Sequence, residues 1–210
     1  MKDLKIKVCG MKYPDNISAL SDLKPDYMGF IFYPPSKRFI GLDFQKSDLN
    51  GIDKDINKTA VFVNAHLNEV IEFSHLYGFK TLQLHGNETP EFCKELMNQG
   101  FKIIKAFGVN DSFDFAVLEQ YTNSVDFFLF DTKTEEHGGS GEVFGWDLLN
   151  NYHLDKPFFL SGGLSLDNLT SIIEIKNPYF FGVDLNSKFE IEPASKDVEK
   201  LELAFKILRN

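Results

Sequence analysis

The sequence has few arginines, few cysteines and no long apolar run, and each shortage excludes a class of protein. Only two of its 22 basic residues are arginine and the net charge is −9, so a nucleic acid backbone would be repelled. Two cysteines cannot form a disulfide framework. The longest apolar runs, such as 127–130, are too short to cross a bilayer, and the first residues lack the apolar core of a signal peptide. We therefore expect a cytoplasmic protein that binds neither nucleic acid nor membrane.

The composition is that of an ordinary globular protein. Apolar residues make up 43% of the 210 positions and charged residues 25%. No stretch has the composition of a linker, so we expect a single domain over residues 1–210. Phenylalanine is abundant, with 22 copies, which predicts a core that depends on aromatic packing.

Short apolar runs recur along the chain at intervals of about 25 residues, the length of a compact strand–helix unit. They lack strict alternation, as is typical of parallel strands that are covered by helices. The eight predicted strands are 5–9, 27–32, 59–63, 81–84, 102–107, 127–131, 158–161 and 179–185.

The segments between these runs carry helix signals. Thr89 precedes a first-turn proline, and Gly78 ends a periodic stretch. Ser165 is a candidate cap for a helix that follows it, and residues 198–208 show one apolar stripe. Residues 39–51 show no clean period, which predicts a short or irregular helix there.

Two architectures accommodate eight strand–helix units: a closed (β/α)8 barrel of the TIM type and an open doubly wound sheet. The first strand–helix turn, at residues 9–12, lacks the G-x-G-x-x-G pattern that seats a dinucleotide in the open sheet. Eight even units favour the barrel. In a barrel the reacting groups lie where the strands end.

A glycine pair follows the seventh predicted strand. Gly162 and Gly163 run from that strand into a helix signal, where backbone N–H groups and a helix N-terminus attract an anion. Asn186 and Ser187 follow the eighth strand, and these two loops are the usual phosphate seat of such barrels. The pair could also be an ordinary turn, but both loops together favour phosphate binding.

Cys9 ends the first predicted strand and shares its face with Lys7. If this face points into the barrel, a nearby ammonium lowers the pKa of the thiol and activates it. Two simpler alternatives are that Cys9 is a buried small apolar residue and that Lys7 pairs with a carboxylate without affecting the thiol.

Asp131 ends the sixth predicted strand before a glycine-rich loop that contains residues 138–141. An acid there is either a cap or a catalytic carboxyl beside a mobile lid. Gln83 and His85 share a face at the end of the fourth strand, as a structural network or as substrate contacts. No cluster has the ligand spacing of a metal site, so we predict none.

Taken together, these motifs resemble those of the phosphoribosylanthranilate isomerases, in the same order and over almost the whole chain. The resemblance is specific because of the combination, since each piece alone is common. The matching motifs are Lys7-Val8-Cys9-Gly10-Met11, Gly29-Phe30-Ile31-Phe32 with Ser36-Lys37-Arg38, Leu82 to Glu88, Gly138 to Gly141 with Phe144-Gly145-Trp146, Ser161 to Leu164, and Gly182-Val183-Asp184 with Lys196-Asp197.

The resemblance implies a (β/α)8 barrel of tryptophan biosynthesis. Such an enzyme converts N-(5-phosphoribosyl)anthranilate into 1-(2-carboxyphenylamino)-1-deoxyribulose 5-phosphate, an Amadori rearrangement that needs no cofactor. By the family pattern, Cys9 matches the general base and Asp131 the general acid, while Arg38 matches the residue that holds the anthranilate carboxylate. The phosphate loops match Gly162, Gly163, Asn186 and Ser187, and further pocket positions match Gln83, His85 and Asp184.

The chain departs from the family pattern at two notable points. Lys188 replaces a glycine of the phosphate loop, and Gly145 replaces an aspartate before Trp146. Two competing functions remain at this stage. Indole-glycerol-phosphate synthase has the same fold but needs a longer chain, and a non-catalytic binding barrel would bind substrate without turnover. We expect a monomer rather than a homodimer.

Overall fold

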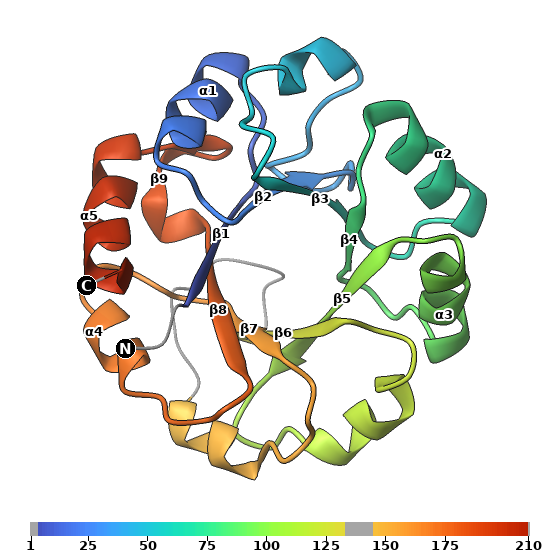
Figure 1. Ribbon diagram of the computed structural model, residues 1–210, viewed down its shortest axis with the longest axis vertical. Coiled ribbons are helices and arrows are strands. Elements are labelled where there is room, and N and C mark those ends of the chain that lie inside the picture. The colour runs from blue at the N-terminus through green and yellow to red at the C-terminus, as the bar shows by residue number, and fades with distance from the viewer. Residues whose placement is uncertain (1–3, 133–144, 210) are drawn as a thin grey trace.

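The computed structural model describes residues 4–132 and 145–209, so the glycine-rich residues 138–141 lie outside the described residues. Within these ranges, eight parallel strands close into a barrel that is surrounded by helices (Figure 1). This confirms the predicted barrel and excludes the open sheet. The strands are β1 (Lys5–Cys9), β2 (Tyr27–Ile31), β3 (Asn57–Phe62), β4 (Thr81–Leu84), β5 (Lys102–Val109), β6 (Phe127–Thr132), β7 (Phe158–Leu160) and β8 (Phe180–Leu185).

The helical segments follow local sequence signals. The side chain of Thr89 accepts a hydrogen bond from the N–H of Phe92 and so caps α3, and Gly78 ends α2 with a φ of 74°. The α-helices are α1 (Pro14–Asp22), α2 (Leu67–Tyr77), α3 (Pro90–Asn98), α4 (Leu169–Ile173) and α5 (Val198–Arg209); the 3-10 helices are η1 (Lys46–Leu49), η2 (Phe115–Tyr121), η3 (Trp146–Asn151) and η4 (Ser187–Phe189).

Two helical segments bear on the sequence predictions. Between β2 and β3 the chain forms only the short η1, as the missing period in 39–51 predicts. The predicted cap at Ser165 is wrong, because α4 begins at Leu169 after a turn and has no side-chain cap. Asn168 takes over locally: its side chain accepts the N–H of Ser165 and donates to the carbonyl of Gly163.

The chain closes on itself around the barrel. β1 pairs in parallel with both β2 and β8, and α5 lies beside α1 and α4 on the outside (Figure 1). The guanidinium of Arg209 donates to the carbonyls of Leu23 and Lys24, which ties the last helix to the first unit. None of the helices in the described part of the chain is both long and apolar enough to span a bilayer.

The barrel interior combines an apolar cluster with buried polar side chains. Strand alternation turns Ile104, Leu129 and Phe159 inward, where they form a buried cluster apart from the main core. The same alternation turns Lys7 and Asp184 inward, and both are buried. Buried polar side chains need partners, so Lys7 and Asp184 mark a polar site at the strand ends.

The main core lies between the strands and the helices, and it depends on aromatic packing. Phe158 is fully buried, and its ring centroid lies 5.0 Å from that of Phe130, 5.1 Å from that of Tyr152 and 5.6 Å from that of Phe180. Such ring pairs add to the stabilisation that burial alone supplies.

We predict that Phe158→Ala lowers the free energy of unfolding by about 3–5 kcal/mol, because the truncation leaves a cavity among rings that cannot collapse. Urea denaturation measures the loss. Leu42→Ala is the control, since Leu42 is 95% exposed and its loss should change stability by less than about 0.5 kcal/mol. A loss below about 1 kcal/mol for Phe158→Ala would contradict the aromatic origin of the core's stability.

Candidate active site

The candidate catalytic residues lie at the carboxyl end of the barrel. Cys9 ends β1, and Asp131 lies near the end of β6 on the opposite side of the ring of strands. Asp184 comes from β8, which neighbours β1, and its Cα is in register with that of Lys7. Parallel pairing therefore brings together residues that are as much as 177 positions apart in the chain.

Lys7 and Asp184 form a buried ion pair beside Cys9. The Nζ of Lys7 lies 2.7 Å from Oδ2 of Asp184, and the two side chains are 0% and 4% exposed. Burial lowers the pKa of Lys7, but Asp184 and Cys9 together raise it above its usual range, so the ammonium stays charged. The simpler alternative is thus right that Lys7 pairs with a barrel carboxylate, but wrong that the thiol is unaffected, because Lys7 also lowers the pKa of Cys9.

Cys9 is buried, and its thiol lies over a glycine. Gly29 on β2 is in register with Cys9, and a Cβ at Gly29 would approach the Sγ atom to 2.6 Å. A side chain at this position would displace the thiol. Gly29 is therefore required for the position of Cys9, a role that the sequence did not reveal.

The expectation of a depressed pKa for Cys9 is wrong. Burial raises the pKa of the thiol above its usual range, and Asp184 adds to that effect. Lys7 and Lys196 lower the pKa but do not cancel the cost of placing a thiolate in the barrel. The free protein therefore holds Cys9 mainly as the thiol at neutral pH.

Asp131, His85 and Gln83 form a row of polar side chains, each in contact with the next. Its Oδ2 atom lies 3.4 Å from Nε2 of His85, and Nδ1 of His85 lies 3.0 Å from Nε2 of Gln83. Asp131 and His85 are partly exposed, whereas Gln83 is buried. The contact with His85 orients the carboxyl of Asp131 at the rim.

Two buried oxygens of this site have no partner in the described part of the chain. Among the described residues, Oε1 of Gln83 and Oδ1 of Asp184 accept no hydrogen bond. Each such atom costs about 1–3 kcal/mol unless a water or a ligand satisfies it. Both atoms are acceptors, so they suit a ligand with hydroxyl or amine donors.

Arg38 lies in the loop after β2, where its guanidinium already binds a carboxylate. Its Nε lies 2.9 Å from Oε1 and 3.0 Å from Oε2 of Glu190, and its Nη2 lies 2.7 Å from Oε2. Glu190 opens the short strand β9 (Glu190–Glu192), which pairs with β10 (Ser195–Lys196). The sequence did not reveal Glu190, because nothing in it indicates contact with a loop 152 residues away.

The glycine pair has a structural role that the sequence did not show. A Cβ on Gly162 would lie 2.4 Å from the backbone nitrogen of Thr132, and Gly162 and Gly163 have φ angles of 86° and 66°. Any larger residue at Gly162 would therefore strain the loop. The helix N-terminus expected directly after the pair is absent, since α4 starts at Leu169.

The second predicted phosphate loop folds as the 3-10 turn η4. The side-chain oxygen of Asn186 accepts a hydrogen bond from Nζ of Lys196 at 2.7 Å, so this oxygen serves the protein itself. Ser187 is half-buried and Lys188 is exposed. Lys188 is not among the described residues with positive φ, so replacing the family's glycine there requires no left-handed backbone.

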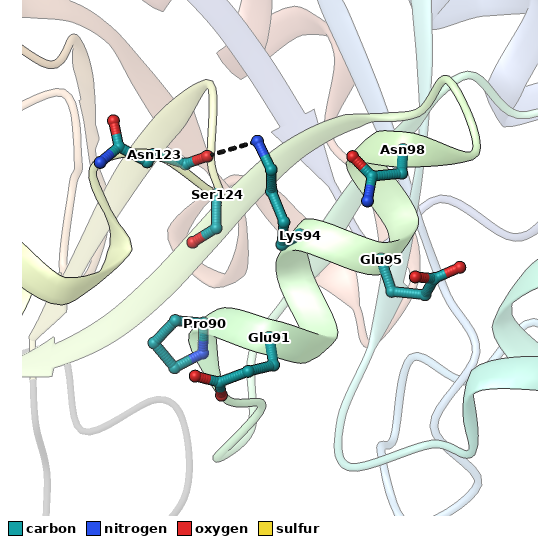
Figure 2. Close-up of a pocket in the computed structure, with 7 residues that line it drawn as sticks. All are labelled: Pro90, Glu91, Lys94, Glu95, Asn98, Asn123 and Ser124. Atoms are coloured by element: carbon teal, nitrogen blue, oxygen red, sulfur yellow. Dashed lines mark hydrogen bonds between the residues drawn. The ribbon is translucent and has the colours of Figure 1, made fainter.

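One surface hollow lies away from the candidate site. An open hollow of about 360 Å³ lies between α3 and the segment 123–124 and holds none of the predicted site residues (Figure 2). There the Nζ of Lys94 donates to the carbonyl of Asn123. Residues 4–132 and 145–209 contain no group of three or more His, Cys, Asp or Glu arranged to hold a metal ion.

Comparison with known proteins shows which family the chain resembles. The family model of N-(5'-phosphoribosyl)anthranilate (PRA) isomerase matches residues 6–207. The N-(5'-phosphoribosyl)anthranilate isomerase of Parabacteroides distasonis is 44% identical over 200 residues, which cover 94% of this chain and 90% of the relative.

Solved structures give the same result. Phosphoribosyl anthranilate isomerase from Thermotoga maritima has a TM-score of 0.86 at 31% identity and covers 98% of each chain. A phosphoribosyl anthranilate isomerase in complex with reduced 1-(o-carboxyphenylamino)-1-deoxyribulose 5-phosphate has a TM-score of 0.83 at 28% identity, again over 98% of each chain. The chain therefore belongs to the N-(5'-phosphoribosyl)anthranilate isomerase family of tryptophan biosynthesis.

Proposed function

We propose that Cys9 and Asp131 are the general base and the general acid with which this isomerase performs its reaction. Its family membership makes the chain an enzyme that converts N-(5-phosphoribosyl)anthranilate into 1-(2-carboxyphenylamino)-1-deoxyribulose 5-phosphate. The observation that carries the assignment is that both side chains come from strand ends at one rim of the closed barrel. One substrate can then meet both groups.

The first step opens the ribose ring. The carboxylic acid of Asp131 gives its proton to the ring oxygen, the C1′–O bond breaks, and the nitrogen lone pair forms a Schiff base with C1′. The contact between His85 and Asp131 supports this role, because it holds the carboxyl in one orientation at the rim.

The second step removes the proton from C2′. The thiolate of Cys9 takes this proton, and the electron pair of the C–H bond forms the C1′=C2′ double bond and neutralises the nitrogen. The enolamine then loses its hydroxyl proton and gains a proton at C1′, which yields the ketone. The burial that raises the pKa of Cys9 makes the thiolate scarce but strongly basic.

The remaining site residues recognise the substrate. The guanidinium of Arg38 suits the planar anthranilate carboxylate. The unpartnered oxygens of Gln83 and Asp184 suit the ribose hydroxyls, with His85 beside them. The loops at Gly162, Gly163, Asn186 and Ser187 suit the phosphate through backbone N–H groups, and Lys188 adds a positive charge to the second loop.

We further propose that the protein is a cytoplasmic monomer. Membership in a family of amino-acid biosynthesis enzymes supports the location. The relative from Thermotoga maritima is described as dimeric, so the monomer is not a family-wide property. Light scattering should give the mass of one chain, 24.0 kDa, and a mass twice as large would contradict the proposal.

The acid–base pair is tested by conservative variants. Cys9→Ala and Asp131→Asn should each lower kcat by about 10²–10⁴-fold, because each removes one proton transfer. The double variant should lose far less than the product of the two effects. A gene that encodes either single variant should fail to rescue a tryptophan auxotroph that lacks the isomerase, whereas the wild-type gene should rescue it. A near-normal kcat for Cys9→Ala would reduce Cys9 to a packing residue.

The pH profile tests how Lys7 acts on Cys9. kcat/KM should rise with pH through the pKa of the thiol. Since Lys7 lowers that pKa, Lys7→Met should move the rising limb to higher pH. Lys105→Met is the matched control: it also leaves a buried carboxylate, Glu88, without its lysine, but on another ion pair. An unchanged limb for Lys7→Met would show that Lys7 serves Asp184 alone.

A further inference from the structure

The contact between Arg38 and Glu190 uses one side of the guanidinium and leaves another free. A guanidinium offers two edges for bidentate binding, one formed by Nε with an Nη atom and one formed by the two Nη atoms. Glu190 occupies the edge formed by Nε and Nη2. The described residues provide no hydrogen bond to Nη1, and the Arg38 side chain keeps 19% of its surface exposed.

Glu190 is itself held in place by other groups. Its Oε1 atom lies 2.6 Å from Nζ of Lys196 and 3.1 Å from the N–H of Ala194. The side chains of Glu190 and Lys196 are 5% and 0% exposed. Burial acts to raise the pKa of Glu190, but Arg38 and Lys196 bring it below the usual range, so the carboxylate stays ionised.

The stem of Arg38 is fixed as well. A Cβ on Gly10 would lie 2.7 Å from Cδ of Arg38 and 3.1 Å from Oδ1 of Asn186, so the stem packs against the backbone that follows Cys9. The same Asn186 oxygen accepts a hydrogen bond from the ammonium of Lys196. The guanidinium is thus held from both ends, by glycine packing on the stem and by a fixed carboxylate on one edge.

We propose that Glu190 is a positioning residue that aims the free Nη1–Nη2 edge of Arg38 at the carboxylate of the substrate. The proposal rests on the role proposed for Arg38. A carboxylate fixed by Lys196 and by the backbone of Ala194 orients a flexible arginine before the substrate arrives, which removes an ordering cost from binding. Such a residue acts on binding more than on the proton transfers.

The opposite role makes a different prediction. If Glu190 instead imitated the substrate carboxylate and had to leave, it would compete with binding, and its removal would lower KM. The sign of the change in KM therefore separates a positioning residue from an internal competitor.

The experiment compares Glu190→Gln with Glu192→Gln by steady-state kinetics on N-(5-phosphoribosyl)anthranilate. Glu190→Gln should raise KM about tenfold and change kcat less than about twofold, as expected when a supporting partner of a binding group is lost. Glu192 lies on the same strand, is exposed, and loses the same charge in its variant, so Glu192→Gln should leave both constants unchanged.

Arg38→Lys separates the two proposals. It should raise KM about tenfold to a hundredfold, and Glu190→Gln should add nothing once Arg38 is lysine. An unchanged KM for Arg38→Lys overturns the role of Arg38 itself. A raised KM for Arg38→Lys with an unchanged or lowered KM for Glu190→Gln overturns only the role of Glu190.

Two further readouts keep the test decisive. A fall in kcat with unchanged KM would show that Glu190 acts on Cys9 through Lys196 rather than on substrate binding, and would overturn the proposal. If Glu190→Gln fails to fold by circular dichroism, Glu190→Asp replaces it, since a carboxylate shorter by one methylene still pairs with Lys196 but misplaces Arg38. KM for Glu190→Asp should then rise in the same direction, and a normal KM would contradict the role.

Discussion

The ion pair between Lys7 and Asp184 is the interaction on which the rest of this barrel depends. It joins β1 to β8, the seam at which the two ends of the chain close the ring, and both charges are buried. Removal of one partner from such a pair costs about 3–5 kcal/mol, because the other charge is then uncompensated. The same ammonium lies next to Cys9, so the group that supports closure of the barrel also supplies positive charge to the proposed base.

The burial that makes this seam possible sets the chemical character of Cys9. In an exposed loop the thiol would ionise more readily, whereas here the low polarity around it raises its pKa. Two buried lysines, Lys7 and Lys196, counteract that effect only in part. The site therefore combines a scarce thiolate with a carboxyl, Asp131, that lies at the partly exposed rim in contact with His85. One fold thus gives the two proposed proton-transfer groups different surroundings.

Much of the fold was predictable because its signals are local. Eight apolar runs predicted eight strands, Thr89 and Gly78 predicted helix ends, and the missing period in 39–51 predicted a reduced helix. Ser165 was a misleading cap signal because the side chain of Asn168 binds the turn that contains it, and the helix begins three residues later than expected. Strand alternation placed Cys9 and Lys7 on one face, but that this face points into the barrel was only a condition of the argument. Gly29 and Glu190 did not follow, because their roles depend on atoms of distant segments.

The sequence by itself determined the barrel, the family and the list of residues at the strand ends, because periodicity, turn residues and motif order are local properties of a chain. Only the tertiary structure decided what those residues touch. It pairs the Lys7 ammonium with Asp184, and it raises rather than lowers the pKa of Cys9. It also explains why residue 162 is a glycine, since a Cβ there would collide with the backbone of Thr132. It also brought Glu190 onto Arg38 across 152 positions. Distances, burial and pKa shifts are properties of the folded chain, because closure of the barrel decides which groups are buried together.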